Sequence, residues 1–342
     1  MVPMRIAVLG ATGAVGREML RTLDERRSAA DELVPLASPR SAGVRLPFGD
    51  RVVEVRAVDR AAFEGVGIAL FSAGADASRE WATVAVGAGA TVVDNSSAFR
   101  MEPDVPLVVP EINRDALERH RGIVANPNCT AITALMAVAP LHLVAGLSRL
   151  VVSSYQSVSG AGHRGVAELL EQVEKLRGAE EDLARPDPDA LPAGDAFGRT
   201  IAYNVLPRGG VFDPDGATTE ETKFVNETRK ILGLPDLEVA VTVVRVPVIV
   251  GHSVSIYAEF EEDLSPEAAR LALGRFPGVE VVDDPLHDRF PTPLDAAGRD
   301  EILVGRIRPG PRRRSLQLFA TGDNLRKGAA LNAVQIAEAL TR

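Results

Sequence analysis

The sequence predicts an α/β protein in which a domain built on a doubly wound parallel sheet precedes an α+β domain with a largely antiparallel sheet. Short Val/Ile/Leu-rich runs alternate with amphipathic stretches over the first third of the chain, an order typical of parallel sheets. Beyond residue 129 the strand-like segments are longer and widely separated, as expected of antiparallel pairing. The length of 342 residues also exceeds what one hydrophobic core usually fills.

The first domain is expected to span residues 1–128. Its predicted elements are a strand at 5–9, a helix at 15–27 and strands at 33–36, 68–71 and 91–93. The run at 68–71 is apolar at every position, which is typical of a strand covered on both faces. These elements therefore predict a sheet buried between helices.

The second domain is expected to span residues 129–323, with strands at 150–158, 237–250, 253–260 and 315–320. Residues 174–194 are acidic and then rich in Pro and Asp, which indicates an exposed connection. The segment 324–342 carries apolar residues at helical spacing and is expected to return to the first domain as a helix. Its predicted buried positions are Leu331, Val334, Ile336 and Leu340.

The composition limits the possible partners. The formal net charge of -9 argues against nucleic acid or an anionic membrane as the partner, and no apolar run approaches the length of a membrane span. The single cysteine, Cys129, fits a reducing compartment, and the start of the chain does not resemble a signal peptide. We therefore expect a cytoplasmic protein. As a separate prediction, we expect no metal site.

A glycine-rich turn follows the first predicted strand. Its spacing is G-x-x-G-x-x-G over Gly10, Thr12, Gly13, Ala14, Val15 and Gly16. Between a strand and a helix, such glycines let the backbone approach a pyrophosphate, as in a Rossmann-type dinucleotide site. The spacing departs from the commonest fingerprint, so a glycine-rich turn without a ligand is the alternative.

The end of the second predicted strand indicates which dinucleotide is preferred. An NAD site usually has a carboxylate there, whereas this chain has Ser38, Arg40 and Ser41. Arg40 with the two serines could bind a 2′-phosphate, which favours NADP(H). The alternative is that Arg40 is a solvated loop cation.

The segment 126–130, which contains Cys129, precedes an apolar helical run at residues 131–143. A cysteine at a helix N-terminus is expected to favour the thiolate, which is the nucleophilic form. A buried, inert cysteine at the start of a core helix is the alternative. His252 stands at the predicted start of a strand and Arg245 lies in a strand otherwise made of Val, Pro and Ile, where a cation requires an anionic partner.

Eight motifs in sequence order resemble those of the aspartate-semialdehyde dehydrogenase family. They include Asn126-Pro127-Asn128-Cys129-Thr130 and Gly251-His252, and they span nearly the whole chain. The others lie at residues 10–16, 95–100, 156–162, 220–223, 245–248 and 323–328. The resemblance implies an NADPH-dependent reductive dephosphorylation of L-aspartyl-4-phosphate through a cysteine thioester, in a homodimer.

The same resemblance implies a role for each matching residue. Cys129 would be the nucleophile, His252 the acid/base catalyst, and Gln156 and Asn128 would complete the catalytic set. Substrate contacts would come from Arg245 for the carboxylate, Glu220 for the amino group, and Arg100 with Lys223 for phosphate. Nucleotide contacts would come from residues 12–15 with Arg40, Ser41, Ser159, Gly160 and Asn324.

Two rival interpretations remain. A thioester dehydrogenase for N-acetyl-glutamyl phosphate or glyceraldehyde phosphate would share the nucleotide domain and the Cys/His pair. It would not call for a carboxylate such as Glu220, because an acetylated amine carries no charge. The other rival is a catalytically silent, nucleotide-binding relative, which retention of Cys129, Gln156, Arg245 and His252 disfavours.

Overall fold

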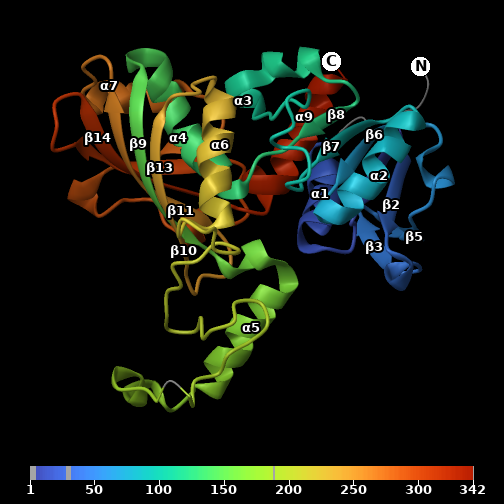
Figure 1. Cartoon of the computed structure of the whole chain (residues 1–342), viewed down its shortest axis with the longest axis horizontal. Helices are drawn as coiled ribbons and strands as arrows, with labels where there is room; N and C mark the ends of the chain where they lie inside the picture. Colours follow the sequence, from blue (N-terminus) through green and yellow to red (C-terminus); the bar gives the residue numbers. More distant parts are fainter. Residues whose placement is uncertain (1–4, 28–31, 188, 342) are drawn as a thin grey trace.

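The structure is a computed structural model that describes residues 5–27, 32–187 and 189–341. Two lobes lie side by side, one built on each of two six-stranded sheets, and a helical arm projects from one of them (Figure 1). Among the described residues, no helix is long and apolar enough to cross a membrane.

The first lobe contains a wholly parallel sheet, as predicted. Its strand order is β5-β2-β1-β6-β7-β8, and each neighbouring pair runs in the same direction. The strands are β1 (Arg5–Leu9), β2 (Glu32–Ala37), β5 (Arg56–Ala57), β6 (Val66–Phe71), β7 (Thr91–Asp94) and β8 (Ile123–Ala125). A small hairpin of β3 (Arg45–Phe48) and β4 (Arg51–Glu54) lies outside this sheet.

Helices cover both faces of this sheet. α1 (Ala14–Glu25) and α9 (Leu331–Leu340) share one apolar cluster with β1, while α2 (Ala75–Gly87) packs with Phe63 and Phe71 in another. Of the four predicted positions in the last helix, Leu331, Val334 and Ile336 are buried, and Leu340 is half-buried at the edge. The end of the chain thus supplies part of the core beneath its first strand (Figure 1).

A buried arginine ties this returning segment to the first helix. Arg326 lies in a π-helical turn, η7 (Arg326–Ala330), directly before α9. Its guanidinium lies 2.9 Å from Glu18 and 2.8 Å from Glu25, both on α1, and 2.6 Å from Asp300 of the other lobe. Because three carboxylates surround one cation, the contact fixes η7 against both lobes.

The second lobe contains a mixed, largely antiparallel sheet of order β10-β9-β11-β14-β13-β12. Only its outermost pairs, β10 with β9 and β12 with β13, are parallel. The strands are β9 (Leu147–Gln156), β10 (Glu238–Arg245), β11 (His252–Phe260), β12 (Val279–Val281), β13 (Ile302–Pro309) and β14 (Ser315–Gly322). The predicted strand at 237–250 was too long: β10 ends at Arg245, ahead of Pro247, which has no N–H to donate to a ladder.

Three helices cover one face of the second sheet. They are α4 (Cys129–Ala145), α6 (Thr219–Leu232) and α7 (Pro266–Arg275), which share the largest apolar cluster. α4 is apolar on all sides and almost wholly buried, as expected of a central helix. Its first residue is Cys129, so the core of the lobe holds this residue in place.

The arm consists of α5 (Gly162–Lys175), η5 (Glu180–Ala184) and the connection that follows (Figure 1). A small separate cluster around Leu169, Leu176 and Ile201 holds it together. The segment 174–194, expected to be an exposed connection, is indeed mostly exposed where it is described. Short elements elsewhere are η1 (Pro39–Ser41), η2 (Ala61–Phe63), α3 (Pro110–Asn113), η3 (Arg114–Arg119), η4 (Val158–Ala161), η6 (Pro285–His287) and α8 (Pro293–Ala296).

Candidate active site

Three strand ends of the second sheet meet at one edge. β9 ends at Gln156 and β10 at Arg245, and these two residues are register partners. β11 runs antiparallel to β9 and therefore begins at the same edge, with His252. The sheet thus gathers three polar side chains that are distant in sequence.

Cys129 begins helix α4 beside this edge. The Asn128 side chain caps the helix by accepting the Thr130 N–H at 2.9 Å, and Gln156 Nε2 donates to Thr130 Oγ1 at 2.6 Å. The turn η7 packs directly behind the cysteine: a β-carbon at Gly328 would lie 2.9 Å from Cys129 Cβ. Glycine is therefore required at 328, and the returning C-terminal segment positions Cys129.

Burial raises the pKa of the Cys129 thiol to about 11, and the negative charge of Glu220 acts in the same direction. Arg245, Arg100 and the Thr130 N–H oppose the shift without cancelling it. The Thr130 N–H at the helix N-terminus favours the thiolate as expected, but burial has the larger effect, so the pKa of the thiol stays above its usual value. Attack by Cys129 requires a group that removes its proton.

His252 is fully buried, and its Nδ1 accepts the Ser157 N–H at 3.1 Å. Burial, and secondarily the charge of Arg245, hold its pKa well below the usual value, so the ring is neutral. With Nδ1 accepting, the proton is assigned to Nε2. Within the described part of the chain, Nε2 is buried without a hydrogen-bond partner, so it is free for a ligand.

The predicted nucleotide contacts Ser159 and Asn324 lie in the surroundings of His252. Asn324 Oδ1 accepts from Ser157 Oγ at 3.0 Å, and Asn324 also bonds Ser159 Oγ. Gly160 lies against the imidazole, because a β-carbon there would be 3.2 Å from His252 Nε2. These residues are remote in sequence from the glycine-rich turn, so any ligand contacting both groups must span the two lobes.

Arg245 and Glu220 line one cavity of about 870 Å³. Arg245 is buried, its Nη1 donates to the Ser157 carbonyl at 2.9 Å, and its Nη2 is 3.6 Å from Glu220 Oε1. The guanidinium also lies over the Phe197 ring. This loose ion pair at a cavity wall presents one positive and one negative group to a small molecule.

Arg100 makes close contacts with acceptors of the chain itself. Its guanidinium donates to the carbonyls of Asn126 and Asn95, each at 2.9 Å, and to Glu227 at 3.0 Å. Lys223 lies half-buried on α6, three residues after Glu220. Arg100, Arg245 and Glu220 all act electrostatically on Cys129, which places their charges around the thiol.

Glu227 was not identified from the sequence. Its carboxylate is fully buried, accepts Arg100 Nη1 with one oxygen and accepts the Asn128 N–H with the other at 2.6 Å. The spacing of four residues from Lys223 to Glu227 places both on one face of a helix, which was the available signal. With Lys223 facing the site, Glu227 on the same face of the helix would have been expected to face it too and to pair with a cation there.

The glycine-rich turn borders a second cavity, of about 570 Å³, at the end of the first sheet. Among its lining residues are Gly10, Thr12, Gly13, Ser38, Arg40 and Ser41. Ala14, Val15 and Gly16 form the first turn of α1; a β-carbon at Gly16 would lie 2.1 Å from the Gly10 carbonyl, and one at Gly10 would strike the backbone of Ser72. The cavity thus suits the phosphate-bearing part of a dinucleotide, with the N-terminus of α1 beside it.

The fold and this site together define a class, a two-domain NAD(P)-binding oxidoreductase of the semialdehyde dehydrogenase type. Residues 5–120 match the family model described as "Semialdehyde dehydrogenase, NAD binding domain". Residues 138–327 match the one described as "Semialdehyde dehydrogenase, dimerisation domain".

Similar proteins and structures specify the family. Aspartate-semialdehyde dehydrogenase of Bacillus subtilis (strain 168) is 45% identical, covering 99% of this chain and 98% of the relative. That of Mycolicibacterium smegmatis is 50% identical, covering 98% and 99%. The crystal structure of aspartate semialdehyde dehydrogenase II complexed with ASA from Vibrio cholerae superposes with a TM-score of 0.93 at 42% identity, covering 99% and 98%. The chain belongs to the aspartate-semialdehyde dehydrogenase family.

Proposed function

We propose that the chain catalyses the reversible, NADPH-dependent reductive dephosphorylation of L-aspartyl-4-phosphate to L-aspartate-4-semialdehyde through a thioester on Cys129. This reaction would serve the biosynthesis of lysine, methionine, threonine and isoleucine. One observation carries the proposal: Cys129 lies at the start of a buried helix within electrostatic reach of Arg100, Arg245 and Glu220. That set combines a nucleophile with groups suited to an anionic, amino-bearing substrate.

His252 is proposed to handle the protons. Its Nδ1 is occupied by the Ser157 N–H, so Nε2 is the atom that exchanges a proton with the reacting groups. To accept the Cys129 thiol proton at Nε2, the neutral ring would carry its own proton on Nδ1, which lies 3.0 Å from Ser157 Oγ. The imidazolium formed in this way would then return the Nε2 proton to the oxygen of a tetrahedral species. When bound, the nucleotide supplies or accepts the hydride.

The substrate is proposed to bind in the cavity between the second lobe and the arm. Arg245 would bind its carboxylate and Glu220 its amino group, because both line the same cavity. Arg100 and Lys223 would bind the phosphate that cleaves the thioester. Gln156 Oε1 is buried without a partner among the described residues, and is proposed to orient the substrate or thioester.

NADP(H) is the proposed nucleotide, in preference to NAD. No carboxylate follows β2, where Ala37 is succeeded by Ser38, and Arg40 and Ser41 line the same cavity. The pyrophosphate would lie at residues 10–16, and the nicotinamide end near Ser159, Gly160 and Asn324. The residues present therefore fit a dinucleotide with a 2′-phosphate.

A homodimer built through the second domain is part of the proposal. On the face of the second sheet opposite α4, α6 and α7, Tyr155 and Phe319 are in ring contact, with Tyr257 on the strand between them. Tyr155 is 38% exposed, which is unusual for an aromatic residue in the middle of a sheet. Two copies joined at this face would cover it.

The division of the chain into domains is also proposed. Residues 1–128 with 324–342 would form the nucleotide domain, and 129–323 the catalytic and dimerisation domain. The shared apolar cluster of β1, α1 and α9 supports this division. A reducing compartment, the cytoplasm, suits a chain whose single thiol is its proposed nucleophile.

The deciding experiment is phosphate-dependent reduction of NADP by the purified protein with aspartate semialdehyde. N-acetyl-glutamate semialdehyde and NAD serve as the competing substrate and nucleotide. We expect activity with aspartate semialdehyde alone, its loss in Cys129→Ala with NADPH binding retained, and a fall of about 10² to 10⁴ in His252→Ala. A folded, NADPH-binding protein that is silent with aspartate semialdehyde would disprove the proposal.

A further inference from the structure

Glu227 contacts two parts of the site at once, the Arg100 guanidinium and the backbone that precedes Cys129. One carboxylate oxygen accepts from the Arg100 guanidinium at 3.0 Å, and the other accepts the Asn128 N–H at 2.6 Å. Asn128 caps helix α4 and directly precedes Cys129. Both oxygens are fully buried with their residue, so both contacts are shielded from water.

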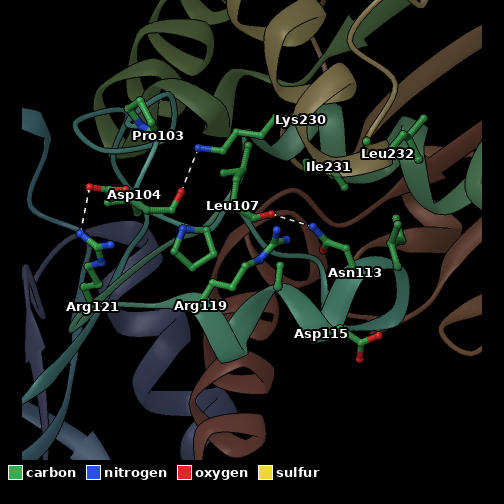
Figure 2. Close-up of a pocket in the computed structure, with 15 residues that line it drawn as sticks. Pro103, Asp104, Leu107, Asn113, Asp115, Arg119, Arg121, Lys230, Ile231 and Leu232 are labelled. Atoms are coloured by element: carbon green, nitrogen blue, oxygen red, sulfur yellow. Dashed lines mark hydrogen bonds and ion pairs between the residues drawn. The ribbon is translucent and has the colours of Figure 1, made fainter.

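A second residue of α6 fixes the backbone that carries Arg100. Lys230 Nζ donates to the carbonyls of Arg100, Glu102 and Val105, at 2.8, 2.9 and 2.8 Å. Figure 2 shows Lys230 reaching from α6 toward the loop that carries Pro103 and Asp104. Glu227 and Lys230, one turn apart, thus hold the side chain and the main chain of the same residue.

We propose that Glu227 is a positioning residue that sets the Arg100 guanidinium relative to the Cys129 nucleophile. This inference rests on the proposed function, in which Arg100 binds the phosphate that attacks the thioester carbon while the Cys129 sulfur leaves. Attack requires the phosphate oxygen and the carbonyl carbon to be close and aligned. One rigid carboxylate spanning both groups provides that alignment.

The two halves of the reaction separate this role from a merely structural one. Forming the thioester releases NADPH in a burst that needs no phosphate, and only the second half requires Arg100. In Glu227→Gln the amide oxygen can still accept the Asn128 N–H, but the charge facing Arg100 is gone. We expect the burst rate to be kept. The ratio of kcat/KM for phosphate to the burst rate should fall about tenfold or more, because a hydrogen bond to a charged group contributes a free energy of that size.

Glu221→Gln is the matched control, because Glu221 is on the same helix and likewise accepts with both oxygens, in its case from the backbone N–H groups of Thr218 and Val243. It is expected to lower the melting temperature and to leave the ratio of the two rates unchanged. If the Glu227→Gln ratio falls less than about tenfold, or if burst and phosphate steps fall equally, the inference is overturned. Should that variant not fold, Glu227→Asp takes its place: its shorter carboxylate cannot span both partners, and an unchanged ratio overturns the inference equally.

A turnover-independent measurement separates this inference from the proposed function. If the wild-type protein shows no phosphate-dependent activity, the proposed function fails. The rate at which iodoacetamide alkylates Cys129 still reports the contact with Asn128. In Glu227→Ala that rate is expected to change by about threefold or more, and in Glu221→Gln to stay constant. An unchanged rate in folded Glu227→Ala shows that Glu227 does not position the nucleophile.

Discussion

Arg100 and Arg245 are both buried guanidinium groups that act on Cys129, yet the protein holds them in opposite ways. Arg100 has two carbonyls and the fully buried Glu227 at hydrogen-bond distance. Arg245 has one carbonyl, and its carboxylate partner Glu220 is 3.6 Å away and a quarter exposed. The chain accepts from three of the five N–H groups of the first cation and leaves two for phosphate, whereas the second has more capacity left for a ligand. Burial alone thus does not show how much of a cation is available for binding.

The largest difference is expected in stability. Arg100→Met leaves Glu227 as a buried, unpaired charge and should lower the free energy of unfolding by about 3–5 kcal/mol. Arg245→Met leaves Glu220 partly in water and should cost about 1 kcal/mol. Urea denaturation of both variants measures the two costs, and equal costs would remove the distinction.

For binding of the aldehyde substrate, changing Arg245 should have a larger effect than changing Arg100. Arg245→Lys replaces a planar fork by a point donor and should raise KM for aspartate semialdehyde about tenfold to a hundredfold, with little change in kcat. Arg100→Lys should leave that KM near the wild-type value. Steady-state kinetics at saturating phosphate tests both, and an unaltered KM in Arg245→Lys would exclude the carboxylate contact.

The ionisation of His252 should respond to Arg245 and not to Arg100. Burial is the main cause of its lowered pKa and Arg245 the second, so Arg245→Met should raise the pKa while leaving it below the usual value. A proton NMR titration of the imidazole ring measures the shift. Arg100→Met is the control, and an equal shift in both variants would show that the protein responds globally.

The smallest effect is expected at the thiol. Glu220 adds to the burial that raises the pKa of Cys129 to about 11, so Glu220→Gln should lower that pKa. The thiolate fraction at pH 8 then increases, and iodoacetamide should alkylate Cys129 about threefold faster. Glu238→Gln, at the far end of β10, is the matched control. A slower reaction in Glu220→Gln would contradict the sign of the effect.

Local patterns predicted much of the fold because local sequence dictates it. The strand at 5–9 coincides with β1, and the apolar run at 68–71 lies within a strand buried in the parallel sheet. The mixed sheet of the second lobe followed from its longer strands. The overlong strand at 237–250 shows the limit: a proline decides where pairing ends, and apolar residues continue past it.

The features of the site that the sequence did not predict depend on tertiary structure. Glu227 meets Arg100 across 127 residues of sequence, and no spacing rule joins them. The sequence also could not predict that the pKa of Cys129 is raised. A helix N-terminus is visible in the order of residues, whereas the burial that outweighs it is produced by η7, Gly328 and the rest of the lobe.

The return of the C-terminal segment to the first sheet has a consequence for synthesis on the ribosome. The apolar cluster beneath β1 takes Ala333, Val334, Ile336 and Ala337 from the last helix. A nascent chain therefore emerges with this face of its first sheet covered by α1 but not yet by α9, and the second lobe can complete its core earlier. The domain that is translated first therefore completes its apolar core last, after α9 has been synthesised.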